Sequence, residues 1–174
     1  MLQLSHLITT NSIQTFIVKC NYSLIMDNQD IDVIRLEEYD TKDVRDQHTN
    51  GSLTVVWRDW DNLIKIPQMV YVSSVNPGEI KGPHLHTKRN SYFLCIHGEV
   101  VFIIQKKSGE YQEINVKAET PTLIFIPKNV PSAHINISNG VSRVLTLADL
   151  SWKPNDNETK NILFNDYDWD KWKK

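Results

Sequence analysis

The sequence has few cysteines and no long apolar run, and each shortage excludes a class of protein. Its 174 residues include only two cysteines, Cys20 and Cys95, too few for a disulfide framework. Cys95 lies inside the apolar run FLCI, where a buried reduced thiol is the ordinary interpretation. No apolar run approaches the roughly 18–20 residues that a membrane span requires. We therefore expect a reducing compartment, the cytoplasm, and no membrane partner.

An excess of charge of either sign is also absent. The chain has 19 Lys and Arg against 21 Asp and Glu, a formal net charge of −2. Its basic residues are scattered, so no stripe resembles a nucleic-acid or membrane-binding face. This distribution excludes a nucleic-acid partner. It leaves open an anionic small ligand, because a local cluster of cations can oppose the average charge.

The length suits one domain with a substantial core. The first 25 residues are mildly apolar but lack the basic start and compact hydrophobic block of a signal peptide. Their composition differs from that of the rest, and Met26 is a candidate natural start. We therefore expect residues 1–25 to be an N-terminal extension, disordered or not native, and residues 26–174 to form a single domain.

Short apolar or alternating segments dominate the chain after Met26. Segments rich in Val, Ile, Tyr, Phe and Thr read as strands, namely Leu53–Trp57, Met69–Val75, Tyr92–Ile96, Val100–Gln105, Tyr111–Val116, Leu123–Ile126, His134–Ile137 and Val141–Leu147. Turn residues such as Asn76-Pro77-Gly78 and Asn139-Gly140 separate them. The candidates for a helical turn are Arg35–Asp46 and Asn157–Phe164. The pattern predicts an all-β sandwich or barrel, with the tail FNDYDWDKWKK folded back across a surface.

Three histidines stand out as candidates for chemistry. His84 and His86 end the segment GEIKGPHLH, and if that segment is a strand, its two-residue period puts both imidazoles on one face. His134 follows the proline-bracketed turn PKNVPSAH and opens another strand. A lone histidine is more often a hydrogen-bonded core or surface residue, which is our interpretation of His6, His48 and His97.

The segment GPHLHTKRNSYFLCIHGEV, followed by PTLIFIPKNVPSAHINI, resembles the paired motifs of the cupin superfamily. The resemblance implies a double-stranded β-helix, the cupin jelly-roll barrel, with these histidines on its inner face. Over about residues 45–172 the chain is most similar to the dTDP-4-dehydrorhamnose 3,5-epimerase family. The positions that match its motifs are Gln47–Gly51 for a DxRG-like segment, Lys81–His84 for Arg-Gly-x-His, His134 for a histidine after a proline turn, Asp149 for a late aspartate, and Leu163–Trp172 for the Trp/Asp-rich ending.

The resemblance implies an isomerase that abstracts a proton next to the C4 ketone of a nucleotide-linked 6-deoxyhexose. Imidazole titrates near neutral pH, so His84 is the expected base, and Asp149 is expected to orient its ring. The resemblance also implies no cofactor, a homodimer, a nucleotide-sugar substrate and a place in carbohydrate or polysaccharide biosynthesis.

Three positions depart from the epimerase pattern. Ser91 stands where the family has a lysine, Leu145 where it has its tyrosine acid, and Lys81 keeps the charge of the family's arginine without its bidentate fork. Tyr71 is a candidate replacement acid, or simply an aromatic that lines the barrel. The candidate catalytic residues are thus His84, Asp149, Tyr71 and His86, and the candidate substrate-binding residues are Lys81, Lys88, Arg89 and His134.

Three alternatives remain open at this point. Cupin 3,4-ketoisomerases of dTDP-4-keto-6-deoxyglucose carry a Gly-x-His-x-His-Lys-like segment, which Gly82–Lys88 resembles, and they do without the epimerase tyrosine. A metal-dependent cupin would use His84, His86 and His134 as nitrogen ligands, although we expect no metal because the usual glutamate position is Ser91. A non-catalytic sugar-binding cupin is the third.

Overall fold

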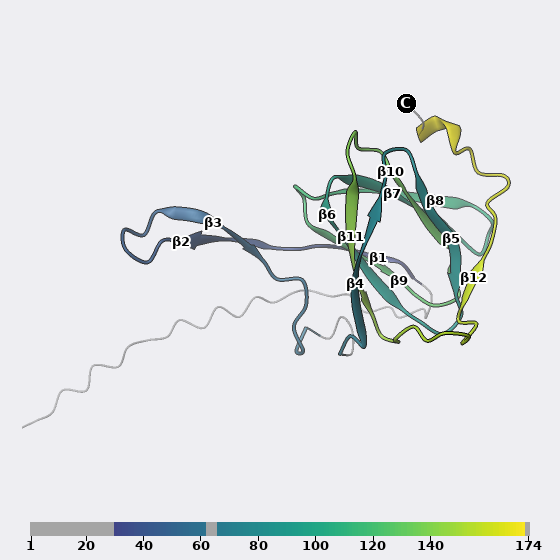
Figure 1. Cartoon of the computed structure of the whole chain (residues 1–174), viewed down its shortest axis with the longest axis horizontal. Helices are drawn as coiled ribbons and strands as arrows, with labels where there is room; N and C mark the ends of the chain where they lie inside the picture. Colours follow the sequence, from purple (N-terminus) through teal and green to yellow (C-terminus); the bar gives the residue numbers. More distant parts are fainter. Residues whose placement is uncertain (1–29, 62–65, 173–174) are drawn as a thin grey trace, which may run out of the picture.

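The computed structural model describes residues 30–61 and 66–172, which form two five-stranded sheets and a hairpin (Figure 1). The elements are β1 (Asp32–Arg35), β2 (Glu38–Lys42), β3 (Thr49–Thr54), β4 (Met69–Val75), β5 (Ile80–His86), β6 (Ser91–His97), β7 (Glu99–Gln105), β8 (Tyr111–Lys117), β9 (Thr122–Ile126), β10 (Ser132–Asn136), β11 (Ser142–Ala148), β12 (Thr159–Asn161) and a 3-10 turn, Asp170–Trp172. The strand orders are β1-β9-β6-β11-β4 and β12-β5-β10-β7-β8. All strand pairs in these two ranges are antiparallel, which confirms the predicted all-β jelly-roll fold.

β6 and β7 have continuous apolar sequences because their side chains are buried on both faces of their sheets. Side chains at alternate positions, such as Phe93 and Phe102, point between the sheets and form the main core. The intervening side chains of β7, Val101 and Ile103, are equally buried on the outer face of their sheet. A strand covered on both sides has no polar face to present, so its sequence shows no alternation.

Segments from the two ends of the chain cover these outer faces. Ile34 and Leu36, in and after β1, help to cover Tyr92 and Leu94 of β6. The C-terminal tail lies on the other sheet, where Phe164 packs with the outward side chains of β7 and β10. The prediction that the tail folds back is therefore confirmed. Burying an aromatic side chain of this size contributes about 1.5–3 kcal/mol.

Both candidate helical turns are wrong. The range 35–46 contains β2, which pairs with β3 in an exposed hairpin that projects away from the barrel (Figure 1). The range 157–164 contains β12, which pairs with β5. Polar sequences such as EYDTK carry no apolar period, so only strand pairing determines their structure. The predicted N-terminal extension lies outside the described residues. Within them, no helix has the length and apolar character needed to cross a membrane.

Candidate active site

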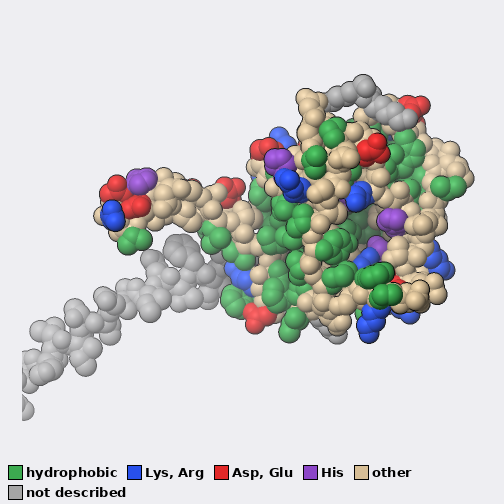
Figure 2. Space-filling model, viewed as in Figure 1, with side chains coloured by type: hydrophobic (Ala, Val, Ile, Leu, Met, Phe, Trp, Pro, Cys, Tyr) green, Lys and Arg blue, Asp and Glu red, His purple; other side chains and the backbone are tan. Residues whose placement is uncertain are grey.

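A cavity of about 260 Å³ lies between the two sheets, on the side of their edge strands β4 and β12. Figure 2 shows histidine side chains on this face of the barrel, close to Lys and Arg side chains. The lining residues are Tyr71, Ser73, Lys81, His84, His86, Arg89, Phe93, Phe102, Ser132, Ala133, His134, Thr146 and Thr159. Phe93 and Phe102 belong to the apolar core, so one end of the cavity is dry and the other is polar.

The close approach of β5 to β10 positions the histidines. Gly82 has a φ of +88°, and a side-chain carbon there would lie 2.9 Å from the carbonyl oxygen of Ser132. Glycine is the residue that tolerates both conditions. The register between the strands shifts at this point, so Ser132 faces His84 while His134 faces Lys81. A local irregularity of this kind redirects side chains relative to a regular strand.

His84 and His86 point into the cavity from the same face of β5, as their two-residue spacing predicted. Their ring centroids are 6.4 Å apart. Within the described part of the chain, the buried Nδ1 of His84 has no hydrogen-bond partner. A buried polar atom without a hydrogen bond costs free energy. A ligand in the cavity that forms a hydrogen bond with this nitrogen would remove that cost.

His86 belongs to a buried ionic network. Its Nδ1 lies 3.1 Å from Oε1 of Glu158, and Nη2 of Arg89 lies 3.0 Å from Nδ1 and 3.1 Å from Nε2. Arg89 and Glu158, which are 6% and 1% exposed, also face each other at 3.4 Å. Burial and then the charge of Arg89 lower the pKa of His86, and Glu158 opposes this shift.

His134 contributes a neutral imidazole at physiological pH. Its side chain packs against Phe102, with ring centroids 5.1 Å apart. Burial lowers its pKa to about 4, and the nearby Lys81 and His84 act in the same direction. Its buried Nε2 is unpartnered among residues 30–61 and 66–172. This nitrogen can form a hydrogen bond with a ligand in the cavity, and the neutral ring adds no charge there.

The predicted hydrogen bond between His84 and Asp149 is not formed. The carboxylate of Asp149 accepts hydrogen bonds from the backbone nitrogen of Asn90, at 2.8 Å, and from its side-chain amide, at 2.6 Å. Asp149 therefore ties the end of β11 to the start of β6 and lies outside the cavity lining. The resemblance matched it by sequence position, whereas the carboxylate that reaches a cavity histidine is Glu158.

The other departures from the epimerase pattern also become clear in the structure. Leu145 packs on the outer face of its sheet with Tyr92 and Leu94, so a tyrosine at this position would not reach the cavity. Its inward neighbour Thr146 pairs in register with Tyr71, and both line the cavity. Ser91 is buried, at 2% exposure.

The predicted cations divide into two groups. Lys81 and Arg89 line the cavity, Lys81 with an exposed side chain and Arg89 with a buried one. Lys88 is exposed on the connection between β5 and β6 and lies outside the lining. Of the two neighbouring cations, the structure thus places Arg89, and not Lys88, in the cavity lining.

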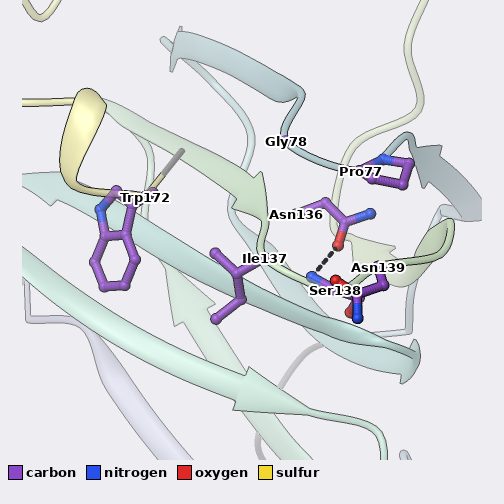
Figure 3. Close-up of a pocket in the computed structure, with 7 residues that line it drawn as sticks. All are labelled: Pro77, Gly78, Asn136, Ile137, Ser138, Asn139 and Trp172. Carbon is purple, nitrogen blue, oxygen red and sulfur yellow. Dashed lines mark hydrogen bonds between the residues drawn. The ribbon is translucent and has the colours of Figure 1, made fainter. Parts of the chain in front are cut away.

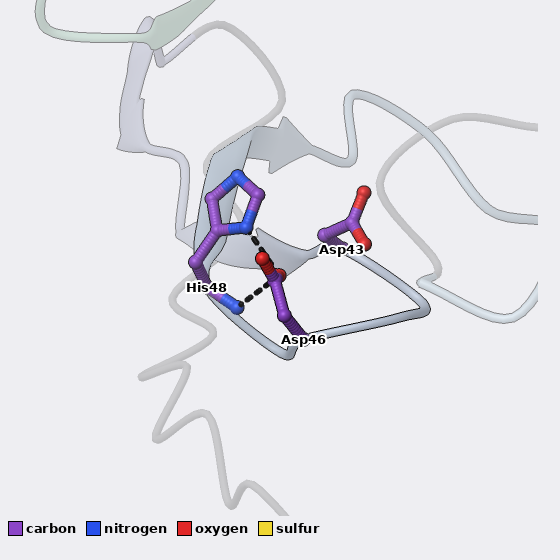
Figure 4. A group of neighbouring side chains, drawn as sticks. All are labelled: Asp43, Asp46 and His48. Carbon is purple, nitrogen blue, oxygen red and sulfur yellow. Dashed lines mark hydrogen bonds and ion pairs between the residues drawn. The ribbon is translucent and has the colours of Figure 1, made fainter.

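The three histidines of the metal alternative do not converge as ligands. In the described ranges, the group that brings three potential ligand atoms within 4.8 Å is Asp43, Asp46 and His48. It lies at the tip of the β2–β3 hairpin, where Asp46 accepts hydrogen bonds from the ring and backbone of His48 (Figure 4). This is also where the DxRG-like match begins, so that segment is remote from the histidine cavity.

A second cavity, of about 250 Å³, lies beside the β4–β5 turn (Figure 3). Its lining comes from the β4–β5 turn, the β10–β11 turn and Trp172. The buried amide of Asn136 donates to the carbonyl oxygens of Val75 and Gly140, and its oxygen accepts from Ser138 and Ser142. Asn136 thus organises the two turns and has no spare hydrogen-bonding group for a ligand.

Sequence reasoning missed Glu158 and Thr159. They lie in the polar stretch NDNETKN, which has the composition of a surface loop. The one available signal was a carboxylate shortly before the aromatic tail, and that signal is weak. Only the pairing of β12 with β5 brings these residues beside His86.

Comparisons with known proteins agree with this fold. A family model described as FdtA, WxcM-like, C-terminal, matches residues 29–167. No curated protein matches the chain in sequence. The capsular polysaccharide assembling protein CapF from Staphylococcus aureus is 23% identical, with a TM-score of 0.51, over 53% of this chain and 27% of CapF. The matched region thus spans about a quarter of CapF.

Two further structures match over most of their length. The dTDP sugar isomerase from Desulfovibrio desulfuricans has a TM-score of 0.68 and 14% identity, over 80% of this chain and 90% of that protein. A histidine-to-asparagine variant of the 3,4-ketoisomerase QdtA from Thermoanaerobacterium thermosaccharolyticum, in complex with TDP-4-keto-6-deoxyglucose, has a TM-score of 0.61 and 17% identity, over 82% and 90%. At these identities the comparison shows a shared fold.

Proposed function

The chain belongs to the family described as FdtA, WxcM-like, C-terminal, and we propose that it isomerises a dTDP-linked 4-keto-6-deoxyhexose by moving protons next to the ketone. The reaction that the cavity supports best is 3,4-ketoisomerisation. The observation that carries this proposal is the pair of imidazoles, His84 and His86, that face one cavity from one strand. The complex of QdtA with TDP-4-keto-6-deoxyglucose supports the substrate class.

The chemistry needs a base beside C3 and a route for the proton between O3 and O4. His84 removes the proton from C3, and the electron pair moves to O4 to give an enediolate. The proton of O3 passes to O4, the charge on O3 forms the new ketone at C3, and C4 takes up a proton. Substrate and product have the same composition, so the overall step requires no redox cofactor. Positioned acids and bases contribute about 10²–10⁴-fold to such transfers.

Five further lining residues take part in this scheme. We propose His86 as the group that passes the proton between the oxygens and Tyr71 as the acid for C4. Arg89 is the buried cation that balances the enediolate. Lys81 and His134 contact the nucleotide sugar, His134 as a neutral hydrogen-bonding group.

The 3,5-epimerase alternative has less support. Its expected dyad needs Asp149, whose carboxylate is engaged by Asn90, and its expected acid position holds the outward-facing Leu145. Epimerisation at both C3 and C5 would also require a base beside each carbon, whereas the cavity histidines are clustered on β5 and β10. The NMR test described next therefore distinguishes epimerisation from ketoisomerisation.

The test follows the carbonyl carbon of ¹³C-labelled dTDP-4-keto-6-deoxyglucose by NMR. We expect the ketone to move from C4 to C3 with the natural chain and to stay at C4 with His84→Asn. The matched control is His97→Asn, because His97 is an exposed histidine at the end of β6. A ketone that remains at C4 while C3 or C5 inverts would identify an epimerase. Binding with no change in the sugar would identify a non-catalytic cupin.

We further propose that residues 26–174 act as one domain within a homodimer, as the resemblance implies. Light scattering after size-exclusion chromatography measures the mass directly. Twice the mass of the 20.2 kDa chain is the expected result. A particle with the mass of one chain would contradict the dimer without affecting the proposed reaction.

A further inference from the structure

One buried carboxylate, in contact with the cavity histidine His86, has no role in the scheme above. Glu158 is 1% exposed and immediately precedes β12. Its backbone is fixed to the end of β5, because its carbonyl oxygen accepts hydrogen bonds from the backbone and the hydroxyl of Thr87, at 2.9 and 3.0 Å. Burying a carboxylate is costly unless specific partners compensate, so its contacts identify what it does.

Those contacts are with His86, Arg89 and Thr159. Oε1 and Oε2 of Glu158 lie 3.1 and 3.3 Å from Nδ1 of His86. Oε1 lies 3.4 Å from Nε of Arg89, and Oε2 accepts a 2.6 Å hydrogen bond from the hydroxyl of Thr159. The carboxylate thus contacts a single nitrogen of the imidazole and also pairs with a buried cation.

We propose that Glu158 is a positioning residue that holds His86 in its Nδ1-protonated tautomer, so that the bare Nε2, which lies 3.1 Å from Nη2 of Arg89, is the nitrogen that accepts a proton from a ligand. This inference rests on the proposed function, in which His86 carries a proton between the substrate oxygens. The hydrogen bond made by one ring nitrogen decides which nitrogen carries the proton. A carboxylate also stabilises the imidazolium that forms when the ring accepts a second proton.

The electrostatics explain why both a cation and an anion are present. Arg89 Nη2 is nearly equidistant from the two ring nitrogens, so its charge acts on the whole imidazole and disfavours protonation. Burial adds to this effect, and Glu158 opposes it. Without the carboxylate, His86 would face a buried cation alone and would accept a proton less readily.

Among the described residues, the groups around His86 come from three elements. The charged or titratable groups in contact with it are Glu158 before β12 and Arg89 on the β5–β6 connection, with His84 next to it on β5. Thr159 is its uncharged partner on β12. Lys81, Tyr71 and His134 line the same cavity.

The experiment compares Glu158→Gln with Glu158→Asp and with a matched control, Glu113→Gln. Glutamine keeps the shape and removes the charge, and aspartate keeps the charge on a shorter side chain. Glu113 forms an ion pair with Lys171 and accepts a hydrogen bond from Tyr167 on the outer face, so its variant also loses a carboxylate from the C-terminal contacts. Two readouts are used: ¹⁵N chemical shifts of His86 as a function of pH, and kcat and KM with the keto-sugar.

The ¹⁵N spectrum of the natural chain should show protonated Nδ1 and bare Nε2 on neutral His86. We expect Glu158→Gln to lower the pKa of His86, because it removes the group that raises it, and to reduce kcat by about tenfold or more with KM within about threefold. The low-pH limb of the kcat profile should move to lower pH by the same shift. Glu158→Asp should recover part of kcat, and Glu113→Gln should match the natural chain.

Two outcomes would overturn the proposal. One is a His86 pKa and tautomer that are unchanged in Glu158→Gln. The other is a thermal stability that falls in this variant while kcat is unaffected, which marks a structural carboxylate. The NMR readout needs no substrate, so a natural chain that leaves the sugar unchanged would refute the proposed function and still allow Glu158 to be judged.

Discussion

Replacing Gly82 with alanine should show how strongly the cavity depends on the close approach of β5 to β10. At a φ of +88°, an alanine pays the strain of a left-handed conformation, roughly 1–2 kcal/mol. Its Cβ would also lie 2.9 Å from the carbonyl oxygen of Ser132 and 3.0 Å from the backbone nitrogen of His84. Both atoms belong to the backbone, so relief requires the strands to separate, at about 1–3 kcal/mol for an overpacked contact.

Two other glycines separate these contributions. Gly109 has a φ of +89° with nothing within 4 Å, so Gly109→Ala carries the strain alone. Gly140 has ordinary φ and open space, so Gly140→Ala should be neutral or slightly stabilising. A free-energy change of 1 kcal/mol shifts the melting temperature of a chain this long by about 2–4 °C. Gly82→Ala should therefore melt about 2–12 °C below Gly109→Ala.

The assay is thermal unfolding followed by circular dichroism, together with turnover of the keto-sugar at 25 °C. Gly82→Ala should lose turnover as well as stability, because the contact also fixes the register opposite His84. Equal melting temperatures for Gly82→Ala and Gly109→Ala would show that the close contact at Gly82 adds no cost, since backbone strain alone would then explain both.

Three further predictions concern the buried His134, the buried Cys95 and the absence of a metal requirement. Because the pKa of His134 falls from an ordinary 6.5 to about 4 on folding, the unfolded chain binds more protons between these values, and the free energy of unfolding should decrease by up to about 3 kcal/mol as pH falls from 6.5 to 4. In His134→Gln, urea titrations across this range should show a smaller decrease, and an unchanged decrease would contradict the burial of this histidine. Burial raises the pKa of the Cys95 thiol to about 11, so in a Cys20→Ser background the folded chain should not react with a thiol reagent at pH 8, whereas the chain in urea should react at once. Dialysis against EDTA should leave turnover unchanged, because proton transfer between His84 and the sugar needs no metal, and a loss that zinc or iron restores would favour the metal-dependent alternative.

The barrel was largely predictable because most of its strands carry their own signal. Met69–Val75 is bounded by turn residues and rich in β-branched side chains, and it was predicted with its exact limits. β5 was predicted only conditionally, since IKGPHLH contains a glycine and a proline, which weaken a strand signal. β2 and β12 have exposed, polar sequences, so their structure depends on the partner strand.

The site was predictable only in part. The two-residue spacing of His84 and His86 is a local property, and it placed both rings in the cavity as expected. The carboxylate partner is a property of tertiary structure. Asp149 and Glu158 are both acidic residues in polar connections, and only the path of the chain brings the second beside a histidine while Asn90 binds the first. Sequence position within a loosely matched motif could not distinguish them.

Deuterium uptake from D₂O into dTDP-4-keto-6-deoxyglucose, read by NMR with the natural chain and with His84→Asn, measures whether His84 removes a proton next to the ketone. We predict deuterium at C3 of the recovered substrate and at C4 of the 3-keto product with the natural chain. His84→Asn should lose this uptake while nucleotide binding persists. A base that acts only in the transition state contributes to turnover and not to the binding of the nucleotide sugar. Uptake that continues in His84→Asn, or no uptake with the natural chain, would contradict the assignment of this cavity as a keto-sugar isomerase site.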